Sequence, residues 1–342
     1  MRGLLTLLLL GFATPLAAQA SLLTSHLRIH DPWVVADTDS QTYWLFSRND
    51  PAVTGDKRLG IMAYVGRDLA HWEKPRVVFT LPDGTWANDG AWAPEVHQWK
   101  GRWYLLATFH NEAAVIQAKG PRPTYRRTTL LAVSDRLDGP FTLMRGGDPI
   151  APADDMTLDG TLHVDAAGKP WLVYAHEWMQ VGVGTIEAMP LKHDLSAAGP
   201  PQLLFRADEA DWVVGQKQPE GDIVHVTDGP ELFRTAKGVL LMLWSSYGKD
   251  GYVQALARST SGTVTGPWEQ LGPLVERDSG HGMLFRAFDG RLMMVVHRPF
   301  KRALAKFYEM RDTVEVLREA VELDGEAYPT HGCPMGAQDA GC

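Results

Sequence analysis

Apolar and polar blocks alternate along the chain in a pattern that recurs five times. In each repeat an apolar stretch leads to a polar turn, often with glycine, and then to a strand rich in aromatic and aliphatic residues. The second strands of the five repeats begin near Tyr43, Trp103, Trp171, Leu240 and Leu292. Successive repeats lie about 50 to 70 residues apart, which is enough for a four-stranded blade. The pattern therefore predicts an all-β fold, a five-bladed β-propeller.

Helical signals are scarce, because Pro and Gly are spread throughout and the apolar runs are short. The best helix candidate is residues 303–322, although residues 313–317 also fit a strand. No linker divides the chain, and propellers exceed the usual length of one domain. We predict one catalytic domain over residues 21–325, followed by a polar tail over residues 326–342.

The N-terminus has the features of a secretory signal peptide. Met1 and Arg2 are followed by an apolar run over residues 4–12 and by an A-x-A cleavage site at residues 18–20. A membrane anchor is the alternative, but the run is shorter than the roughly 20 residues that a span needs. We expect residues 1–20 to be removed and the mature protein, from Ser21, to be periplasmic or secreted, with no membrane association.

Charge and cysteine content narrow the partners. The net charge of −8 argues against nucleic acid and anionic membranes, since both require a basic surface. Cys333 and Cys342 are the only cysteines, and they either form a bridge within the tail or stay as free thiols. The sequence does not predict an oligomeric state.

Polar residues recur at one offset before the second strands. Asp31, Asp159 and Asp228 each lie 12 residues before the start of such a strand, and His281 lies 12 before Met293. In the second repeat Trp92 stands near this offset, and Glu95 follows. Because the first strand of each blade lines the central channel, we expect these side chains to meet at one mouth of it. The alternative is that each aspartate only caps a turn.

Five segments in this order make the chain similar to glycoside hydrolase family 43. They are HDPWV at residues 30–34, WAPEV at 92–96, LDGT at 158–161, DGP at 228–230 and GHG at 280–282. The resemblance implies a five-bladed propeller that hydrolyses glycosides with inversion. It also implies that Asp31 is the general base and that Asp159 tunes the pKa of the acid. The acid position holds Asp228, where the family usually has Glu, and Glu231 is the alternative.

The chemistry explains why carboxyl groups are needed. One carboxylic acid protonates the leaving oxygen while a carboxylate about 6.5–9.5 Å away activates water. The acid must keep its proton near neutral pH, against an ordinary aspartate pKa of about 3.9, and a neighbouring carboxylate raises that pKa. The odd spacing from Asp228 to Glu231 favours opposite faces of a strand, although Pro230 weakens this argument. We favour Asp228 as the acid.

Other residues are candidates for binding the sugar or an ion. Trp33, Trp92, Glu95, Glu177 and His281 lie in or beside the signature segments and are expected to contact substrate. Core packing is the alternative for each Trp, and a surface charge is the alternative for Glu177. The resemblance implies calcium at the propeller centre, held with the help of His281, whereas a hydrogen bond from His281 to backbone is equally compatible.

The expected substrate is a carbohydrate. The resemblance favours an exo-acting α-L-arabinofuranosidase on side chains of plant-type polysaccharides, and a β-xylosidase or a galactan-cleaving exo-enzyme is the alternative. A non-catalytic sugar-binding propeller would agree with an Asp at the acid position. A scaffold for protein partners would not need carboxylates at the channel mouth.

Overall fold

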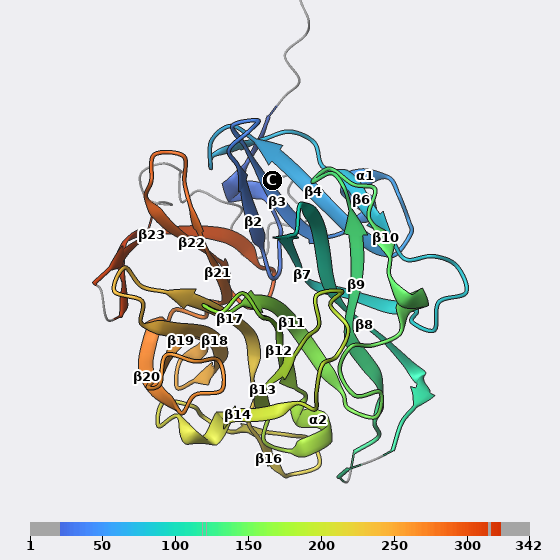
Figure 1. Ribbon diagram of the computed structural model, residues 1–342, viewed down its shortest axis with the longest axis vertical. Coiled ribbons are helices and arrows are strands. Elements are labelled where there is room, and N and C mark those ends of the chain that lie inside the picture. Colours follow the sequence, from blue (N-terminus) through green and yellow to red (C-terminus); the bar gives the residue numbers. More distant parts are fainter. Residues whose placement is uncertain (1–20, 118, 121, 314–315, 323–342) are drawn as a thin grey trace, which may run out of the picture.

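The computed structural model describes residues 21–117, 119–120, 122–313 and 316–322. Within them, five four-stranded antiparallel sheets surround a common centre (Figure 1). The predicted five-bladed β-propeller is confirmed. The predicted signal peptide, the tail, Cys333 and Cys342 lie outside the described residues.

Each blade runs from its inner to its outer strand in chain order. Blade 1 consists of β2 (Trp33–Asp37), β3 (Thr42–Arg48), β4 (Gly60–Gly66) and β6 (Arg76–Thr80). Blade 2 consists of β7 (Asp89–Trp99), β8 (Arg102–Val115), β9 (Tyr125–Ser134) and β10 (Thr142–Leu143). Blade 3 consists of β11 (Thr157–Val164), β12 (Pro170–His176), β13 (Thr185–Pro190) and β14 (Gln202–Arg206). Blade 4 consists of β17 (Asp228–Arg234), β18 (Leu240–Gly248), β19 (Gly251–Ser259) and β20 (Trp268–Val275). Blade 5 consists of β21 (Gly280–Arg286), β22 (Leu292–Arg298), β23 (Leu304–Asp312) and β24 (Leu317–Glu322).

Short elements decorate the blades. Two small sheets pair β1 (Leu22–Leu23) with β5 (His71–Trp72) and β15 (Gln216–Lys217) with β16 (Ile223–Val224). The helices are α1 (Pro51–Thr54), α2 (Trp178–Val181) and three 3-10 turns at Thr24–His26, Arg145–Gly147 and Ala207–Glu209. No helix in the described part of the chain has the length and apolar character needed to cross a bilayer.

The second strand of each blade begins where the hydrophobic pattern predicts it. The middle of each of these strands is apolar and buried because both faces of each blade pack on neighbouring blades. Every residue of β12 is buried, and Val173 packs in one cluster with Met242 and Trp244 of blade 4. Burial of such side chains is the main favourable contribution to holding the blades together.

The helix expected over residues 303–322 is wrong. The described part of this segment forms β23 and β24, which pair with β22 and with each other to complete blade 5. Strand pairing at the edge of an existing sheet buries Ala305 and Phe307 and outweighs a local helix preference.

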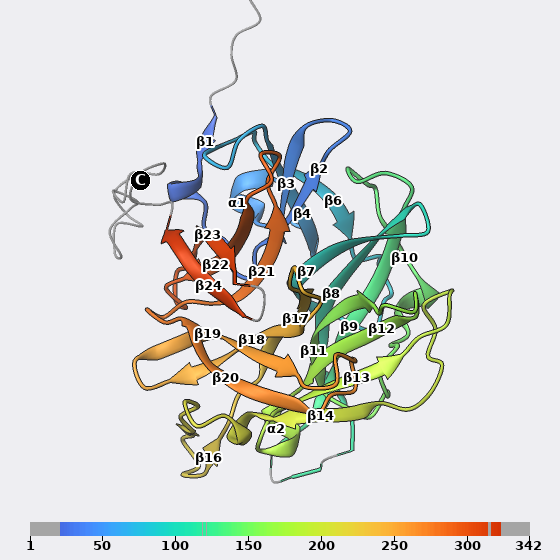
Figure 2. The same cartoon turned by 60° about the vertical axis from the view of Figure 1, so that its left-hand side comes forward.

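The N-terminal segment joins the first blade to the last. The Ile29 N–H donates to the carbonyl of Ala303 in blade 5, and the Thr24 N–H donates to the carbonyl of Ala70 in blade 1. Figure 2 shows this segment beside the sheet of blade 5. His30 and Asp31 follow directly, so their backbone is held between two blades.

Candidate active site

Three of the predicted site residues occupy the same backbone position in their blades. Asp31, Asp159 and His281 have φ values of 48°, 53° and 50°, in the left-handed region. Each lies two residues before the point at which the continuous pairing of its inner strand starts or resumes. A non-glycine residue in this region costs about 1–2 kcal/mol. Such strain is typical of functional sites, and here it accompanies side chains that line the channel mouth.

Asp228 does not share this position, so the predicted common register is wrong by one residue for blade 4. Gly229 occupies the left-handed position there, with φ of 54°, and Asp228 pairs with Ser245 just before the bulge. The error arises because the apolar run of β18 begins one position earlier, relative to the pairing, than that of β12. The Asp228 side chain still lines the same pocket.

The inner strands open into one pocket of about 1050 Å³ at the channel mouth. Its lining includes Asp31, Asp159, Asp228, His281 and Tyr252. The structure thus brings together three predicted carboxyl groups and the predicted histidine from four different blades.

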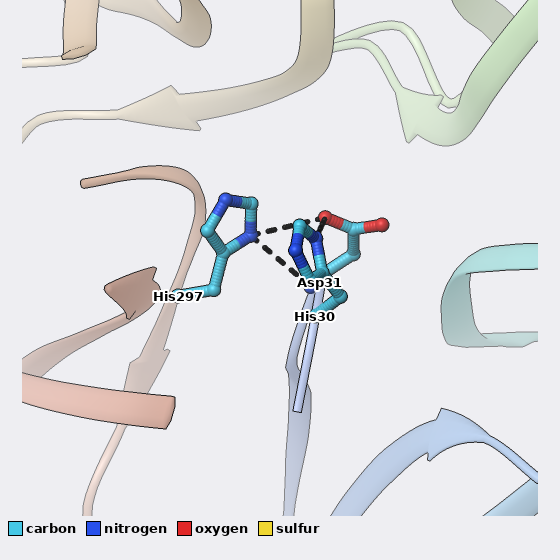
Figure 3. A group of neighbouring side chains, drawn as sticks. All are labelled: His30, Asp31 and His297. Atoms are coloured by element: carbon cyan, nitrogen blue, oxygen red, sulfur yellow. Dashed lines mark hydrogen bonds and ion pairs between the residues drawn. The ribbon is translucent and has the colours of Figure 1, made fainter. Parts of the chain in front are cut away.

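Asp31 is surrounded by imidazoles (Figure 3). Its Oδ1 lies 3.1 Å from His297 Nδ1, 3.3 Å from His281 Nδ1 and 3.6 Å from His30 Nδ1. Burial opposes ionisation of Asp31, but the three histidines outweigh it and hold the pKa of this carboxyl well below its usual range. Asp31 is therefore ionised at neutral pH, as a general base must be.

Asp159 is a buried carboxyl near those of Asp31 and Asp228. Its Oδ2 accepts the backbone N–H of Gly229 at 3.2 Å and lies 3.7 Å from His281 Nδ1. Burial raises the pKa of Asp159, His281 partly offsets that effect, and the charge of Asp31 raises the pKa further. The proton of Asp159 therefore depends on the charge of its neighbours.

Asp228 is the residue predicted to be the acid. The Tyr252 hydroxyl donates to its Oδ2 at 2.8 Å. Burial raises the pKa of Asp228 well above its usual range, and the nearby carboxyls of Asp159 and Glu177 add to the effect. A carboxyl in this environment keeps its proton at neutral pH and can donate it.

Glu231 and Glu95 lie outside the pocket, one layer deeper in the channel. Glu231 accepts the Leu284 N–H at 2.9 Å, and Glu95 lies 2.7 Å from His97 Nε2. Burial raises both pKa values, that of Glu95 to about 8. Neither carboxyl lines the pocket. The pocket geometry therefore favours Asp228 over Glu231 as the acid, and it does not support a sugar contact for Glu95.

Of the other residues predicted to contact the sugar, Trp92 and Glu177 line the pocket and Trp33 does not. Trp33 is in the core, where its Nε1 donates to the Val96 carbonyl, and it does not line the pocket. Trp92 lines the pocket, and its ring lies 4.9 Å from the guanidinium of Arg127. Glu177 also lines it and forms a buried ion pair with Arg127 at 2.5 Å.

Arg127, Tyr252 and His297 were not predicted as site residues. Arg127 and Tyr252 stand on third strands, β9 and β19, where nothing in the repeat marks a polar residue. His297 is the penultimate residue of the predicted strand LMMVVHR, so the only signal was a lone histidine after five apolar residues. All three contact residues that lie at least 24 positions away in the sequence.

The described residues around His281 do not fit a calcium ion. Calcium takes six to eight oxygen ligands. His281 Nδ1 faces two carboxylates, and the cavity beneath it, lined by Glu95 and Glu231, has a volume of only about 10 Å³. That volume is about enough for one water molecule. No catalytic step is therefore assigned to calcium, and its binding stays a prediction.

Comparison with known proteins supports one family. The family model described as glycosyl hydrolases family 43 matches residues 24–315. An endo-arabinase from Bacteroides thetaiotaomicron has a similar structure with a TM-score of 0.75 and 34% identity, over 88% of this chain and 97% of that one. No curated protein sequence matches the chain.

Two more distant structures show the same fold. An α-L-arabinofuranosidase from Lactobacillus brevis is 17% identical with a TM-score of 0.63, over 84% of this chain and 93% of that one. An endo-1,4-β-xylanase from Bacteroides thetaiotaomicron is 21% identical with a TM-score of 0.67, over 89% and 97% of the two chains.

Proposed function

Because the chain belongs to glycoside hydrolase family 43 and is a glycoside hydrolase, we propose that it removes α-L-arabinofuranosyl units from the ends or side chains of plant-type polysaccharides, with inversion. The observation that supports catalysis best is that Asp31 and Asp228 line the same pocket but have opposite electrostatic environments. Asp31 is held ionised by histidines, while Asp228 is held protonated by burial and like charge. Environments that separate two carboxyl pKa values assign one base and one acid.

In the proposed reaction Asp31 accepts a proton from water as that water attacks the anomeric carbon. Asp228 gives its proton to the leaving oxygen on the opposite side. Asp159, when it is ionised, raises the pKa of the acid, and it fixes the backbone at Gly229. His297 and His281 orient the base through its Oδ1.

The sugar assignment rests on similarity. The structure that is 34% identical is described as an endo-arabinase, and the chain covers nearly all of it, which supports the sugar but not the exo mode of attack. Trp92, Arg127 and Glu177 form a polar and aromatic wall suited to a sugar ring with its C–H face and hydroxyls. Export of the enzyme is also part of the proposal, and it rests on residues 1–20 alone.

An endo-acting arabinanase is the second candidate. The 34% identical protein is described as an endo-arabinase. The pocket of about 1050 Å³ also exceeds the space of one furanose, because it extends from the channel mouth to Pro51 of α1. An endo-enzyme would bind several sugars along this extension.

Two assays separate these candidates. Aryl α-L-arabinofuranoside and aryl β-D-xyloside test the sugar, and we expect release from the arabinoside only. Linear arabinan tests the mode of attack: an exo-enzyme releases monomer from the start, whereas an endo-enzyme first releases oligomers. Preference for the xyloside would overturn the sugar assignment, and early oligomers would favour the second candidate.

A further inference from the structure

His30, Asp31 and His297 form a compact group of potential metal ligands at the pocket mouth (Figure 3). One ligand atom from each side chain lies within 4.8 Å of the others. We propose that this group binds a tetrahedral transition-metal ion such as Zn²⁺, and that the bound ion blocks hydrolysis. Two imidazoles and one carboxylate are a donor set that zinc takes readily.

The separations match those of a tetrahedral site. With bonds of about 2.0–2.2 Å, two ligands of a tetrahedral zinc ion lie about 3.3–3.6 Å apart. Asp31 Oδ1 lies 3.1 Å from His297 Nδ1 and 3.6 Å from His30 Nδ1. The ligand atoms of His30 and His297 lie within 4.8 Å of each other, so rotation of the exposed His30 ring would close the site around one ion.

The hydrogen bonds leave ring nitrogens available. His30 Nε2 contacts the Phe300 carbonyl at 2.5 Å, and because a carbonyl only accepts, this nitrogen holds a proton; in the neutral ring Nδ1 therefore presents its lone pair. A ligating histidine commonly uses its other nitrogen in this way. His297 Nδ1 accepts the Asp31 N–H at 3.3 Å, so the neutral ring carries its proton on Nε2, which has no hydrogen-bond partner in the described structure. A metal ion at His297 Nδ1 would replace this long hydrogen bond.

The group is reachable from solvent. The His30 side chain is 47% exposed and lines the pocket with Asp31, whereas His297 is buried beneath them. An ion entering from the pocket would have three protein ligands and an open fourth position for water. Open three-ligand sites of this kind bind zinc in many proteins.

A second group of possible metal ligands shows, by contrast, why the first is open to an ion. Asp155, His176 and Glu187 also bring their ligand atoms together. Both ring nitrogens of His176 are already bonded, to Glu187 and to Gln180. That group is a closed internal network, whereas His30 and Asp31 face the pocket.

The inhibitory effect rests on the proposed role of Asp31 as general base. Coordination to a cation lowers the basicity of the Asp31 carboxylate, which makes it a much poorer acceptor for the proton of the attacking water. The ion also sits in the pocket where the sugar must enter. Inhibition should therefore be reversible by a chelator.

Direct binding is the first test. Untagged protein is titrated with ZnCl₂ by calorimetry, and with CoCl₂ while the visible absorption of tetrahedral Co²⁺ is recorded. We expect saturable binding that His30→Gln weakens at least about 10-fold, since even supporting partners of metal ligands contribute about 10–100-fold. His71→Gln is the matched control, because His71 is exposed and contacts Asp68 on blade 1, far from the pocket. Equal affinity in both variants, or no saturable binding, would overturn the site.

Activity is the second test. Each variant is assayed with ZnCl₂ against its own metal-free rate, and we expect the inhibitory concentration to rise in His30→Gln in parallel with the weaker binding. His30-dependent binding without loss of activity would overturn the inhibitory half of the proposal and count against Asp31 as base. A wild-type enzyme that is active but binds no zinc would overturn the site and leave the proposed function intact.

Discussion

At the scale of the residue, the chemistry depends on the different surroundings of Asp31 and Asp228. Three histidines face the first, whereas burial and two further carboxyls surround the second. Both are aspartates, so their ordinary pKa values are the same and only the fold separates them.

Asp31→Asn keeps the size of the side chain but cannot accept a proton from water. We expect kcat to fall about 10²–10⁴-fold, the usual contribution of general-base catalysis, with the melting temperature little changed. Asp37→Asn, at the end of β2 and outside the pocket, is the control. A variant of Asp31 that retains more than half of the wild-type kcat would refute its role.

Asp228→Asn removes the proposed acid, and its effect depends on the leaving group. Poor leaving groups need protonation, so their cleavage should fall by two or more powers of ten, while activated aryl groups are spared. The raised pKa of Asp228 means that wild-type activity falls only as pH rises through that pKa, and this alkaline limb should disappear in the variant. Glu231→Gln is the comparison, and if it alone shows both effects, Glu231 is the acid.

The sequence predicted which residues form much of the site, but not which side chains they contact. Asp31, Asp159, Asp228 and His281 were found because they recur at similar places in the repeats. Tyr252 and His297 could not be found in this way. His297 lies 266 residues from Asp31, and only the packing of blade 5 beside blade 1 brings them together.

At the scale of the element, the site depends on the irregular starts of the inner strands. Inner strands β7, β11, β17 and β21 each interrupt their pairing at this point. The hydrophobic pattern predicted the second strands because they are continuously apolar. It placed Asp228 one residue out of register because an apolar run does not mark where a bulge lies.

Gly229→Ala tests the bulge of β17. A Cβ at this position would lie 3.0 Å from the His281 ring, and φ is +54°. We expect a loss of stability of about 1–2 kcal/mol from the backbone, together with a lower kcat because the His281 ring must move. Gly238→Ala is the matched control, since φ is +81° there and nothing lies within 4 Å of the added Cβ. Equal kcat values in the two variants would show that the contact with His281 is unimportant.

At the scale of the whole molecule, the five blades act as a frame that brings distant segments to one point. The repeats predicted the number of blades and the convergence of their inner strands. They did not predict how the ring closes, because the N-terminal segment that joins blades 1 and 5 resembles none of them.

Thr24→Val tests this closure. The buried Thr24 hydroxyl donates to the Leu69 carbonyl at 2.6 Å and accepts the Trp72 Nε1–H at 2.6 Å. Valine keeps the shape but leaves both groups unsatisfied, so the free energy of unfolding should fall by about 1–3 kcal/mol or more. Denaturant unfolding measures it, with the exposed Thr38→Val as control. An unchanged midpoint would mean that the segment does not stabilise the ring.

The most direct test of the account is the configuration of the first sugar released from 4-nitrophenyl α-L-arabinofuranoside by the wild-type enzyme, followed by ¹H NMR. Two carboxyl groups that activate water and protonate the leaving oxygen give an inverted product. The account predicts that β-L-arabinofuranose forms first and mutarotates afterwards. Initial formation of the α anomer would contradict the mechanism, and absence of release would contradict the substrate.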